Sequence, residues 1–388
     1  MSTRGGGATS PSKTVYILGA GFSIPAGTPS QAGLMREIFR LDNQGKAFHD
    51  ARDLLATFLT NDLALTPAQM VNVPLEDVYT PIDRCISSNS SFRSHPVGEL
   101  TAIRQALGLV ISRAIDECIR RSTASAAYIH TFARRLVAKA ARRADIARDA
   151  TSTARGKAYD PIAVLSLNWD TLLDNALHAA LLAHHPGTGD YDPFGVVDYC
   201  CYISSLDRND ARVRAGLFSL GCRGFNVKLL KLHGSMNWLQ CPNCQRLYVG
   251  FGQKRQLLNR IGHTRCRHCA ACGLVNHLQG TLVMPTFLKD LSNFQIKLVW
   301  QNAGLELMEA RRLVFIGYSL PYADFEFRQL LSRMVQPGAA IEVVLFKRPG
   351  EDPSYEAERQ RYEQFFGQRK LTFHDTGVVD YIERLPDP

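Results

Sequence analysis

Short runs of consecutive apolar residues, many of them β-branched, recur along the chain and are typical of buried parallel strands. Such runs begin close to residues 15, 162, 228, 313, 341 and 371. Between them lie segments with apolar residues at every third or fourth position, which is the spacing of amphipathic helices. Strands that alternate with helices predict an α/β fold built on a doubly wound, Rossmann-like parallel sheet.

The stretch from about residue 40 to 158 contains no strand-like run. Helical spacing of apolar residues covers 47–65, 98–121 and 126–144, and prolines interrupt the segments between them. We therefore expect one domain over 13–388 with a helical insertion at 40–158. Leu75 to Val78 could begin a helix of this insertion that lines a cleft.

The 388 residues are 45% apolar and 21% charged, which is ordinary for a globular protein and long enough for one large α/β domain with insertions. No apolar run reaches about 18 residues, so no membrane span is expected. Residues 1–12 lack the apolar core of a signal peptide and are expected to form a disordered leader of a cytoplasmic protein.

The formal net charge is +9, and much of the excess lies between Arg134 and Lys157. Such a balance occurs in proteins that bind nucleic acid and in proteins that bind small anions. The segment 134–148 is rich in alanine and arginine and predicts a helix with a charged, solvated face. A nucleic-acid-binding patch is the alternative for this helix.

The first strand, VYIL from Val15 to Leu18, ends at Gly19-Ala20-Gly21. Glycine allows a tight turn and lets a ligand approach the backbone, and a following helix N-terminus would offer unpaired N–H groups to a phosphate. This pattern favours a nucleotide pyrophosphate cradle. The dinucleotide fingerprint G-x-G-x-x-G is not met, because position 24 is Ile24. A purely structural turn is the alternative.

Polar residues follow two later strands, at the end of a sheet where open α/β folds bind ligands. Asn168 and Asp170 come directly after the strand near 162, and Asp170 is placed to cap the next helix. Asn168 is then a candidate ligand contact, or else a turn residue bonded to its own backbone. His233 ends the strand near 228 and could act as a general base, or be held by neighbouring backbone.

Ten cysteines, several in C-x-x-C spacing, predict a metal site in a reducing compartment rather than a disulfide framework. Two C-x-x-C knuckles about two dozen residues apart match a structural, tetrahedral Zn²⁺ site in a small module at 239–280. The expected ligands are Cys241, Cys244, Cys269 and Cys272, because a glycine after the last cysteine suits a knuckle turn. Cys266 with Cys269 is the rival second pair, His268 is a remote substitute, and incidental free thiols are the alternative to zinc.

Four segments now form one pattern: GAGFSIPAGTP, SLNWDTLL, KLHGSMNW followed by C-x-x-C, and FIGYSLPYAD. Together they resemble the sirtuin (SIR2) superfamily, and most closely the bacterial SIR2-like NAD-hydrolysing proteins of anti-phage defence. The motifs extend from about residue 15 to 346, in the order and strand context of that family. The resemblance implies that NAD⁺ binds across the carboxyl ends of the sheet.

The resemblance also implies roles for particular residues. Asn168 matches the asparagine that holds the nicotinamide ribose and positions water, and His233 matches the catalytic histidine. The zinc module after the histidine is also as in sirtuins. The residues expected to bind NAD⁺ are Gly19, Ala20, Gly21, Ser23, Pro29, Asp170, Gly317 and Ser319.

The first motif departs from the protein-deacylating sirtuins, which continue it with Asp-Phe-Arg. Here Pro29 is followed by Ser30-Gln31-Ala32. This departure and the large helical insertion favour water over acyl-lysine as the acceptor, and so an NAD⁺ glycohydrolase that releases nicotinamide and ADP-ribose. A protein deacylase or ADP-ribosyltransferase is the alternative enzyme, and a non-catalytic subunit that binds NAD or ADP-ribose is the alternative outside catalysis.

An enzyme that depletes cellular NAD⁺ during infection would be toxic if always active, so restraint is expected. Self-assembly into a homo-oligomer would supply it, or a separately encoded partner such as a nucleic-acid-dependent ATPase or an Argonaute-like protein. The motivation is that the SIR2-like pattern fills the sequence and leaves no segment for a fused sensor.

Overall fold

The computed structural model describes residues 13–42, 44–149, 161–184, 195–208, 210, 212–213, 224–252, 264–284, 286 and 289–386, although the side chains of 143–149 are not described. The expected leader at 1–12 lies outside these residues, as do parts of the expected helical insertion and zinc module. Among the described residues, no helix has both the length and the apolar character needed to cross a membrane.

Seven parallel strands form the main sheet, in the order β11-β10-β9-β1-β2-β5-β3. Six of them are the strands expected from the apolar runs, so the predicted parallel α/β sheet is confirmed. The seventh, β3, is a short edge strand that the sequence pattern did not predict. The strands are β1 Thr14–Leu18, β2 Ile162–Ser166, β3 Gly195–Asp198, β5 Phe225–Lys231, β9 Arg312–Ile316, β10 Ala340–Val344 and β11 Leu371–His374.

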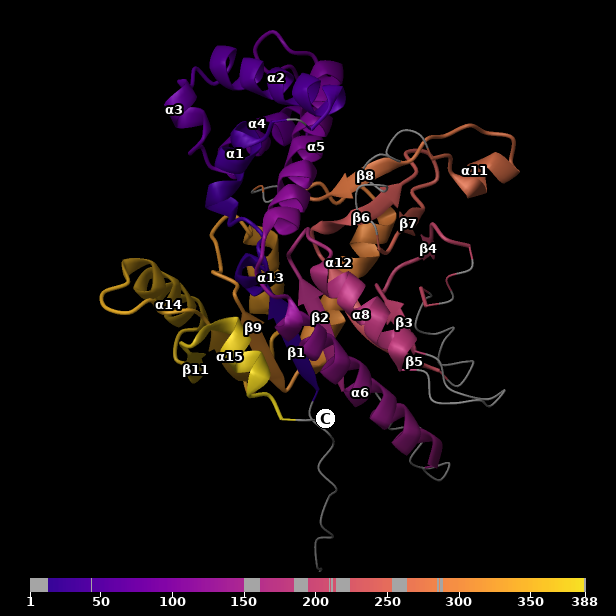
Figure 1. The fold of residues 1–388 in the computed structure, drawn as a ribbon, viewed down its shortest axis with the longest axis vertical. Helices are drawn as coiled ribbons and strands as arrows, with labels where there is room; N and C mark the ends of the chain where they lie inside the picture. Colours follow the sequence, from indigo (N-terminus) through magenta and orange to yellow (C-terminus); the bar gives the residue numbers. More distant parts are fainter. Residues whose placement is uncertain are drawn as a thin grey trace, which may run out of the picture.

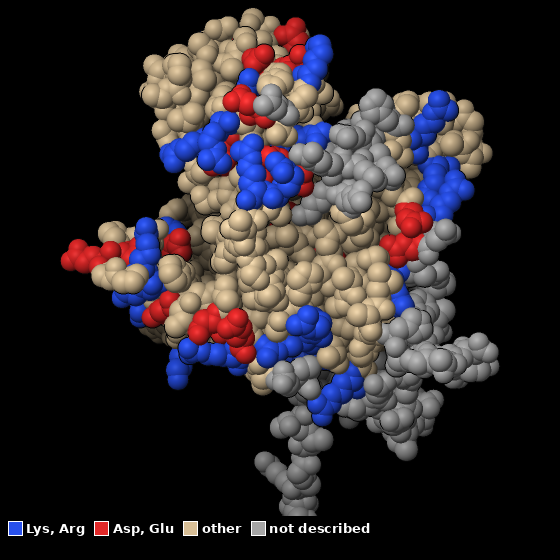
Figure 2. Space-filling model, viewed as in Figure 1, with Lys and Arg blue, Asp and Glu red and all other residues tan. Residues whose placement is uncertain are grey.

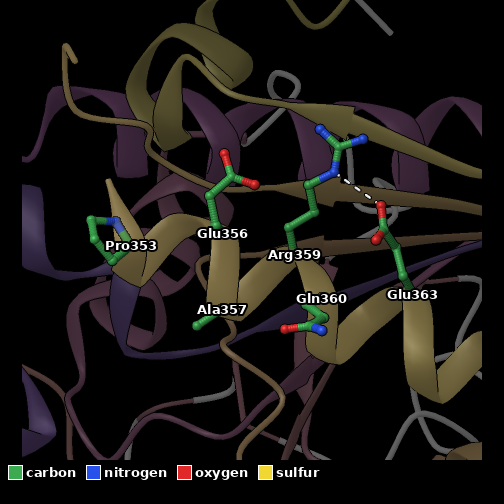
Figure 3. Close-up of a pocket in the computed structure, with 6 residues that line it drawn as sticks. All are labelled: Pro353, Glu356, Ala357, Arg359, Gln360 and Glu363. Carbon is green, nitrogen blue, oxygen red and sulfur yellow. Dashed lines mark hydrogen bonds and ion pairs between the residues drawn. The ribbon is translucent and has the colours of Figure 1, made fainter. Parts of the chain in front are cut away.

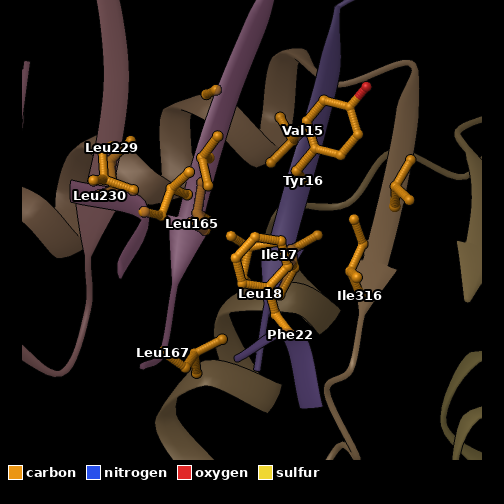
Figure 4. Close-up of a cluster of buried hydrophobic side chains, with 14 of the residues drawn as sticks. Val15, Tyr16, Ile17, Leu18, Phe22, Leu165, Leu167, Leu229, Leu230 and Ile316 are labelled. Atoms are coloured by element: carbon orange, nitrogen blue, oxygen red, sulfur yellow. The ribbon is translucent and has the colours of Figure 1, made fainter. Parts of the chain in front are cut away.

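Strand β1 lies in the middle of the sheet and is buried along its whole length. Its apolar side chains pack among those of β2, β5 and β9, as Figure 4 shows for Val15, Ile17 and Leu18. Burial on both faces explains why β1 reads as an unbroken apolar run rather than an alternating one. Because β1 is central, the loop that follows it lies at the middle of the sheet's carboxyl edge.

The strand order runs outward from β1 in both directions, so right-handed crossovers place helices on both faces of the sheet. On one face α6 packs against α8, β5 and α15, and on the other α12 packs against α13. The alternation of strand and helix in the sequence therefore produces two helical layers around one sheet. These helices are α6 Ala127–Asp149, α8 Leu172–Ala183, α12 Phe294–Glu309, α13 Phe325–Met334, α14 Pro353–Phe366 and α15 Gly377–Glu383.

The first helices form a separate group above the sheet, with its own apolar core (Figure 1). They are α1 Gln31–Arg40, α2 Lys46–Asn61, α3 Pro67–Met70, α4 Leu75–Ser87 and α5 Val97–Arg121. The long helix α5 packs against α1, α2 and α4 and connects this group to α6. The buried residues of α6 belong instead to the core around the main sheet. The start of α4 at Leu75 is as expected from the sequence.

A smaller, four-stranded sheet in the order β4-β7-β6-β8 lies beside the helical group. Its strands are β4 Ile203–Ser205, β6 Gly234–Gln240, β7 Leu247–Val249 and β8 Gln279–Leu282, and it carries the short helix α11 Arg267–Ala271. Strand β6 starts one residue after His233, so this sheet is joined directly to the end of β5. Met236 of β6 also packs into the core of the helical group.

The basic helix α6 has a buried apolar stripe that includes Phe132, Leu136 and Val137. Of its described cations, Arg135 donates to the Ile382 carbonyl oxygen and Arg134 is exposed. On the face seen in Figure 2, Lys and Arg occur in separate groups with Asp and Glu among them. The described part of α6 is therefore an amphipathic helix packed on the main sheet.

Candidate active site

The loop after β1 consists of two 3₁₀ turns, Ala20–Phe22 and Ile24–Ala26, and not of a helix N-terminus. Helix α1 starts only at Gln31, with the Ser30 hydroxyl accepting from the Gly33 N–H at 3.2 Å. The expectation that a helix N-terminus directly follows the glycines is therefore wrong. The Gly27 backbone, at φ +97°, bends the chain away before α1 can begin.

The glycine loop packs backbone to backbone against the loop after β9. The Gly21 N–H donates to the Gly317 carbonyl oxygen at 2.8 Å. A Cβ added at Gly19 would lie 2.6 Å from that oxygen, and one added at Gly317 (φ +59°) would lie 2.3 Å from the Gly21 carbonyl carbon. Both distances are too short for any side chain. Loop packing alone therefore explains these glycines, and a ligand site must be argued from the polar groups around them.

Asn168 joins the end of β2 to the glycine loop. Its side-chain nitrogen donates to the Gly19 carbonyl oxygen at 2.8 Å and to the Ser23 hydroxyl at 3.3 Å, and the residue is buried. It is not a turn residue bonded to its own backbone. Asp170, by contrast, accepts from the Leu172 N–H at 3.0 Å just before α8, but the N-cap of this helix is Thr171 and not Asp170 as expected.

A buried ion pair between Lys231 and Asp174 lies next to the loop that follows β2. Lys231, the last residue of β5, donates to the Asp170 carbonyl oxygen at 2.7 Å and to the Asp174 carboxylate at 3.1 Å. The Tyr199 hydroxyl donates to the other oxygen of Asp174 at 2.9 Å. Both charged side chains are at most 2% exposed. This network fixes the polar loop after β2 against the end of β5.

His233 is buried, and its two ring nitrogens have different surroundings. Nδ1 lies 3.0 Å from the Leu167 carbonyl oxygen, which can only accept, so Nδ1 carries a proton. Nε2 makes no regular hydrogen bond and lies 3.3 Å from Oδ1 of Asp324. The backbone therefore holds one ring nitrogen and the other faces Asp324, and the role of His233 as a general base stays a prediction.

Asp324 is a residue of the site that the sequence analysis missed. It comes from the loop between β9 and α13, and the Tyr318 hydroxyl donates to its Oδ2 at 2.9 Å. The Lys289 ammonium lies 2.9 Å from Oδ1. Burial alone would raise the pKa of Asp324, but the contacts of its carboxylate with His233 and with the Lys289 ammonium outweigh that effect and hold this pKa well below its usual range. Asp324 ends the segment FIGYSLPYAD, so an acidic residue in that motif was the available signal.

Strand order explains why these residues meet. Strands β9, β1, β2 and β5 are neighbours in the sheet, and each ends in one of the polar or glycine-rich loops. The main cluster is His233 with Asp324, Lys289 and Tyr318, beside the pair of Asn168 and the glycine loop. Of the other expected residues, Ala20 is exposed, Pro29 is half-buried before α1, and the Ser319 carbonyl oxygen accepts from Arg361 at 2.8 Å.

A surface hollow of about 510 Å³ lies along α14 and is not part of this site (Figure 3). Its lining includes Glu356, Arg359 and Glu363, on the side of α14 opposite the buried Tyr362. Arg359 pairs with Glu363 at 3.0 Å, so its charge is already compensated. None of the residues that line the hollow belongs to the cluster around His233.

Four cysteines of the smaller sheet form a candidate metal centre. Cys241 and Cys244 follow β6, and Cys266 and Cys269 lie at the start of α11. Their sulfur atoms all lie within 4.8 Å of one another, with 3.6 Å between Cys241 and Cys269 and 3.6 Å between Cys244 and Cys266. A tetrahedral zinc site with Zn–S bonds of about 2.3 Å has sulfur–sulfur distances of about 3.8 Å. The cluster can therefore hold Zn²⁺.

The structure brings the rival Cys266, and not the expected Cys272, into this sulfur cluster. Cys266 and Cys269 are one helical turn apart across the start of α11, which brings both sulfurs to the same side. Cys272 follows the last turn of α11 and is exposed. Gly273, at φ +76°, then turns the chain. This glycine, which suggested Cys272 as a ligand in the sequence, therefore follows the end of helix α11.

No protein-family model matches the sequence, and comparison with curated proteins finds no match. Among solved structures, one from a study of sirtuin substrate affinity is 14% identical and covers 96% of this chain and 92% of its own, with a TM-score of 0.35. A Sir2 homologue in complex with NAD is 14% identical, with coverages of 97% and 91% and a TM-score of 0.34. These similarities are distant.

Proposed function

We propose that this chain is an NAD⁺ glycohydrolase that cleaves the bond between nicotinamide and ribose and transfers the ADP-ribosyl group to water. The observation that carries the proposal is the placement of Asn168 and His233. Leu167, the residue before Asn168, holds His233 through its carbonyl oxygen, so the amide and the imidazole are fixed relative to each other. Both lie beside the glycine loop at the carboxyl edge of the sheet, where open α/β folds bind nucleotides.

The buried polar atoms of the site fit a substrate rich in hydroxyl groups. His233 Nε2 and the Thr28 hydroxyl oxygen are buried without a hydrogen-bond partner among the described residues. Such atoms are costly unless something bonds to them. Ribose hydroxyls of NAD⁺ would supply that bond to Nε2, and Thr28 lies in the same segment, GAGFSIPAGTP, as the residues that the resemblance assigns to the phosphates.

The reaction follows from these groups. The oxygen of a water molecule bonds to the anomeric carbon of the ribose as the carbon–nitrogen bond breaks, and the electron pair of that bond leaves with nicotinamide. Asn168 would hold the ribose and the water in line, which lowers the entropy cost of the attack. The proton lost by the water passes to His233 Nε2 and then to solvent, so His233 acts as a general base.

The start of α1 supports water as the acceptor. Ser30 caps α1 at the point where deacylating sirtuins carry Asp-Phe-Arg, and Gln31 donates to Glu76 at 2.6 Å. Gln31 thus lies in the first turn of α1 and contacts α4, within the helical group. We also propose that the four-cysteine cluster binds a structural Zn²⁺, because all four positions of a tetrahedral ion are filled by sulfur.

The resemblance further suggests that the enzyme acts in the cytoplasm to deplete NAD⁺ in anti-phage defence. Its activity would then be restrained by self-assembly or by a separately encoded partner. Light scattering and the NAD⁺ cleavage rate at several protein concentrations test the restraint. A monomer with full, constitutive turnover would contradict it.

The test of the reaction is incubation of the purified protein with NAD⁺, with and without an acetylated peptide, followed by chromatography. Without the peptide, we expect the wild type to release nicotinamide and ADP-ribose in equal amounts. We expect Asn168→Ala to cleave NAD⁺ more slowly by roughly 10²–10⁴-fold, which is the usual effect of removing a positioned catalytic group. Release of nicotinamide only in the presence of the peptide would instead identify a deacylase. Tight binding without turnover would identify a binding subunit.

A further inference from the structure

Lys289 is a buried cation that the proposed reaction does not use. Its side chain is fully buried, in the segment between β8 and α12, and its ammonium donates to the Thr286 carbonyl oxygen at 3.3 Å. The ammonium also lies 2.9 Å from Oδ1 of Asp324 and 3.8 Å from the Glu326 carboxylate. A buried lysine is costly unless it is paired, so this position is built around its carboxylate partners.

The same carboxylate oxygen faces the proposed base. Oδ1 of Asp324 lies between the Lys289 ammonium at 2.9 Å and His233 Nε2 at 3.3 Å. Because Nδ1 of His233 already carries a proton, a proton on Nε2 would make the ring an imidazolium. An uncompensated carboxylate at this distance would stabilise that imidazolium, and a protonated Nε2 cannot accept a proton from water.

We propose that Lys289 is a positioning residue that neutralises Asp324 and so keeps His233 Nε2 free to act as a base. This inference rests on the proposed role of His233 in NAD⁺ cleavage. Asp324 then orients the ring without locking it in the charged form. The function of Lys289 is electrostatic and is exerted through Asp324.

The charged groups around Asp324 and His233 include two further carboxylates, and Lys289 is the cation that compensates Asp324. Glu326 of α13 adds a second carboxylate, and its side chain accepts from the Lys289 backbone N–H at 2.9 Å. Glu76 of α4 also faces Asp324: burial raises the pKa of Glu76, and the negative charge of Asp324 adds to the rise. Among the described residues, Lys289 is the cation whose side chain pairs with Asp324, whereas Lys231 pairs with Asp174 and the Arg328 side chain donates to the Leu320 carbonyl oxygen.

Substitutions of the two partners should act in opposite directions. Lys289→Met leaves Asp324 uncompensated, so His233 should hold its proton up to higher pH. Asp324→Asn removes the carboxylate that faces His233 and leaves Lys289 with only the more distant Glu326 carboxylate, so His233 should lose its proton at lower pH. Each shift should be about one pH unit or more, as for a charge within 4–6 Å. The double variant Lys289→Met/Asp324→Asn removes both charges and should titrate close to the wild type.

The experiment is an NMR titration of the histidine Cε1–H signals, with His233→Ala used to assign the signal of His233. The pH dependence of NAD⁺ cleavage is measured on the same proteins. We expect the acid limb of the rate profile to move with the NMR midpoint in each variant, and Lys289→Arg to restore the wild-type profile. Lys347→Met is the matched control, because Lys347 is 43% exposed and lies beyond β10.

The outcomes separate this inference from the proposed function. If the wild type cleaves NAD⁺ but Lys289→Met changes only KM and leaves the His233 midpoint in place, Lys289 is a substrate contact and the inference is wrong. If the wild type does not cleave NAD⁺, the proposed function fails, while opposite NMR shifts would still support the electrostatic role. If Lys289→Met does not fold, the double variant and Asp324→Asn decide: a double variant that titrates like Asp324→Asn overturns the inference.

Discussion

The metal centre gives a sharp contrast between two neighbouring cysteines. Cys266 is buried among the four clustered sulfurs, whereas Cys272 is exposed at the end of α11. Cys266→Ser should therefore impair zinc binding, and Cys272→Ser should leave it unchanged. The two substitutions are chemically identical and lie six residues apart, so each serves as the control for the other.

The expected size of the effect follows from the ligand count. A structural zinc site contributes about 10–16 kcal/mol in small zinc-binding peptides, which is about 3 kcal/mol for each of four ligands. Loss of one thiolate should then weaken zinc binding by roughly a hundredfold, since 1.4 kcal/mol is tenfold in affinity. The two sulfur–sulfur distances of 3.6 Å are already close to those of a tetrahedral site, so little reorganisation opposes binding in the wild type.

The assay is zinc content by elemental analysis, followed by zinc release to a chromophoric chelator of graded concentration. The wild type and Cys272→Ser should hold one zinc per chain and release it at the same chelator concentration. Cys266→Ser should release it at a concentration roughly a hundredfold lower. Loss of zinc in Cys272→Ser with retention in Cys266→Ser would refute the assignment made from the structure and restore the set expected from the sequence.

Two further substitutions test interactions outside the metal centre. Lys231→Met should lower the free energy of unfolding by about 3–5 kcal/mol, because it leaves the buried Asp174 carboxylate unpaired. The double variant Lys231→Met/Asp174→Leu should recover much of this loss. Equal urea midpoints for the wild type and Lys231→Met would contradict this expectation. At Glu342, burial would raise the pKa, but the Arg312 guanidinium, Tyr381 and His374 lower it. Glu342 therefore stabilises the fold above its unfolded pKa of about 4.3, and this contribution is lost as the pH falls through the folded pKa. The difference in urea midpoint between the wild type and Glu342→Gln should thus be present at pH 7 and shrink towards pH 3, whereas a constant difference would contradict it.

The sheet was predictable where its strands are long and buried on both faces. β1, β2 and β9 each contain four consecutive apolar residues, β5 has four apolar residues among its seven, and the order of strands and helices indicated the parallel sheet. β3 has only four residues, Gly195–Asp198, and the strands of the smaller sheet have three to seven with mixed burial. None of these strands contains four consecutive apolar residues, which is the pattern by which β1 and β9 could be recognised.

The candidate site was predictable in part, for a related reason. Asn168 and His233 each follow a recognisable strand, so their place at the edge of the sheet could be expected. Lys289 and Asp324 lie in irregular segments, and only the folded chain brings their charges together beside His233. The choice between Cys266 and Cys272 depended on where α11 ends, which spacing alone did not decide.

The measurement that tests the central claim most directly is the initial rate of NAD⁺ cleavage by His233→Ala and by a matched control, His130→Ala. His130 is exposed on α6, so its loss should leave the rate unchanged. We predict that the wild type and His130→Ala produce nicotinamide and ADP-ribose at the same rate, and that His233→Ala is slower by roughly 10²–10⁴-fold while remaining folded. Cleavage of NAD⁺ by His233→Ala at the wild-type rate would contradict the proposed active site.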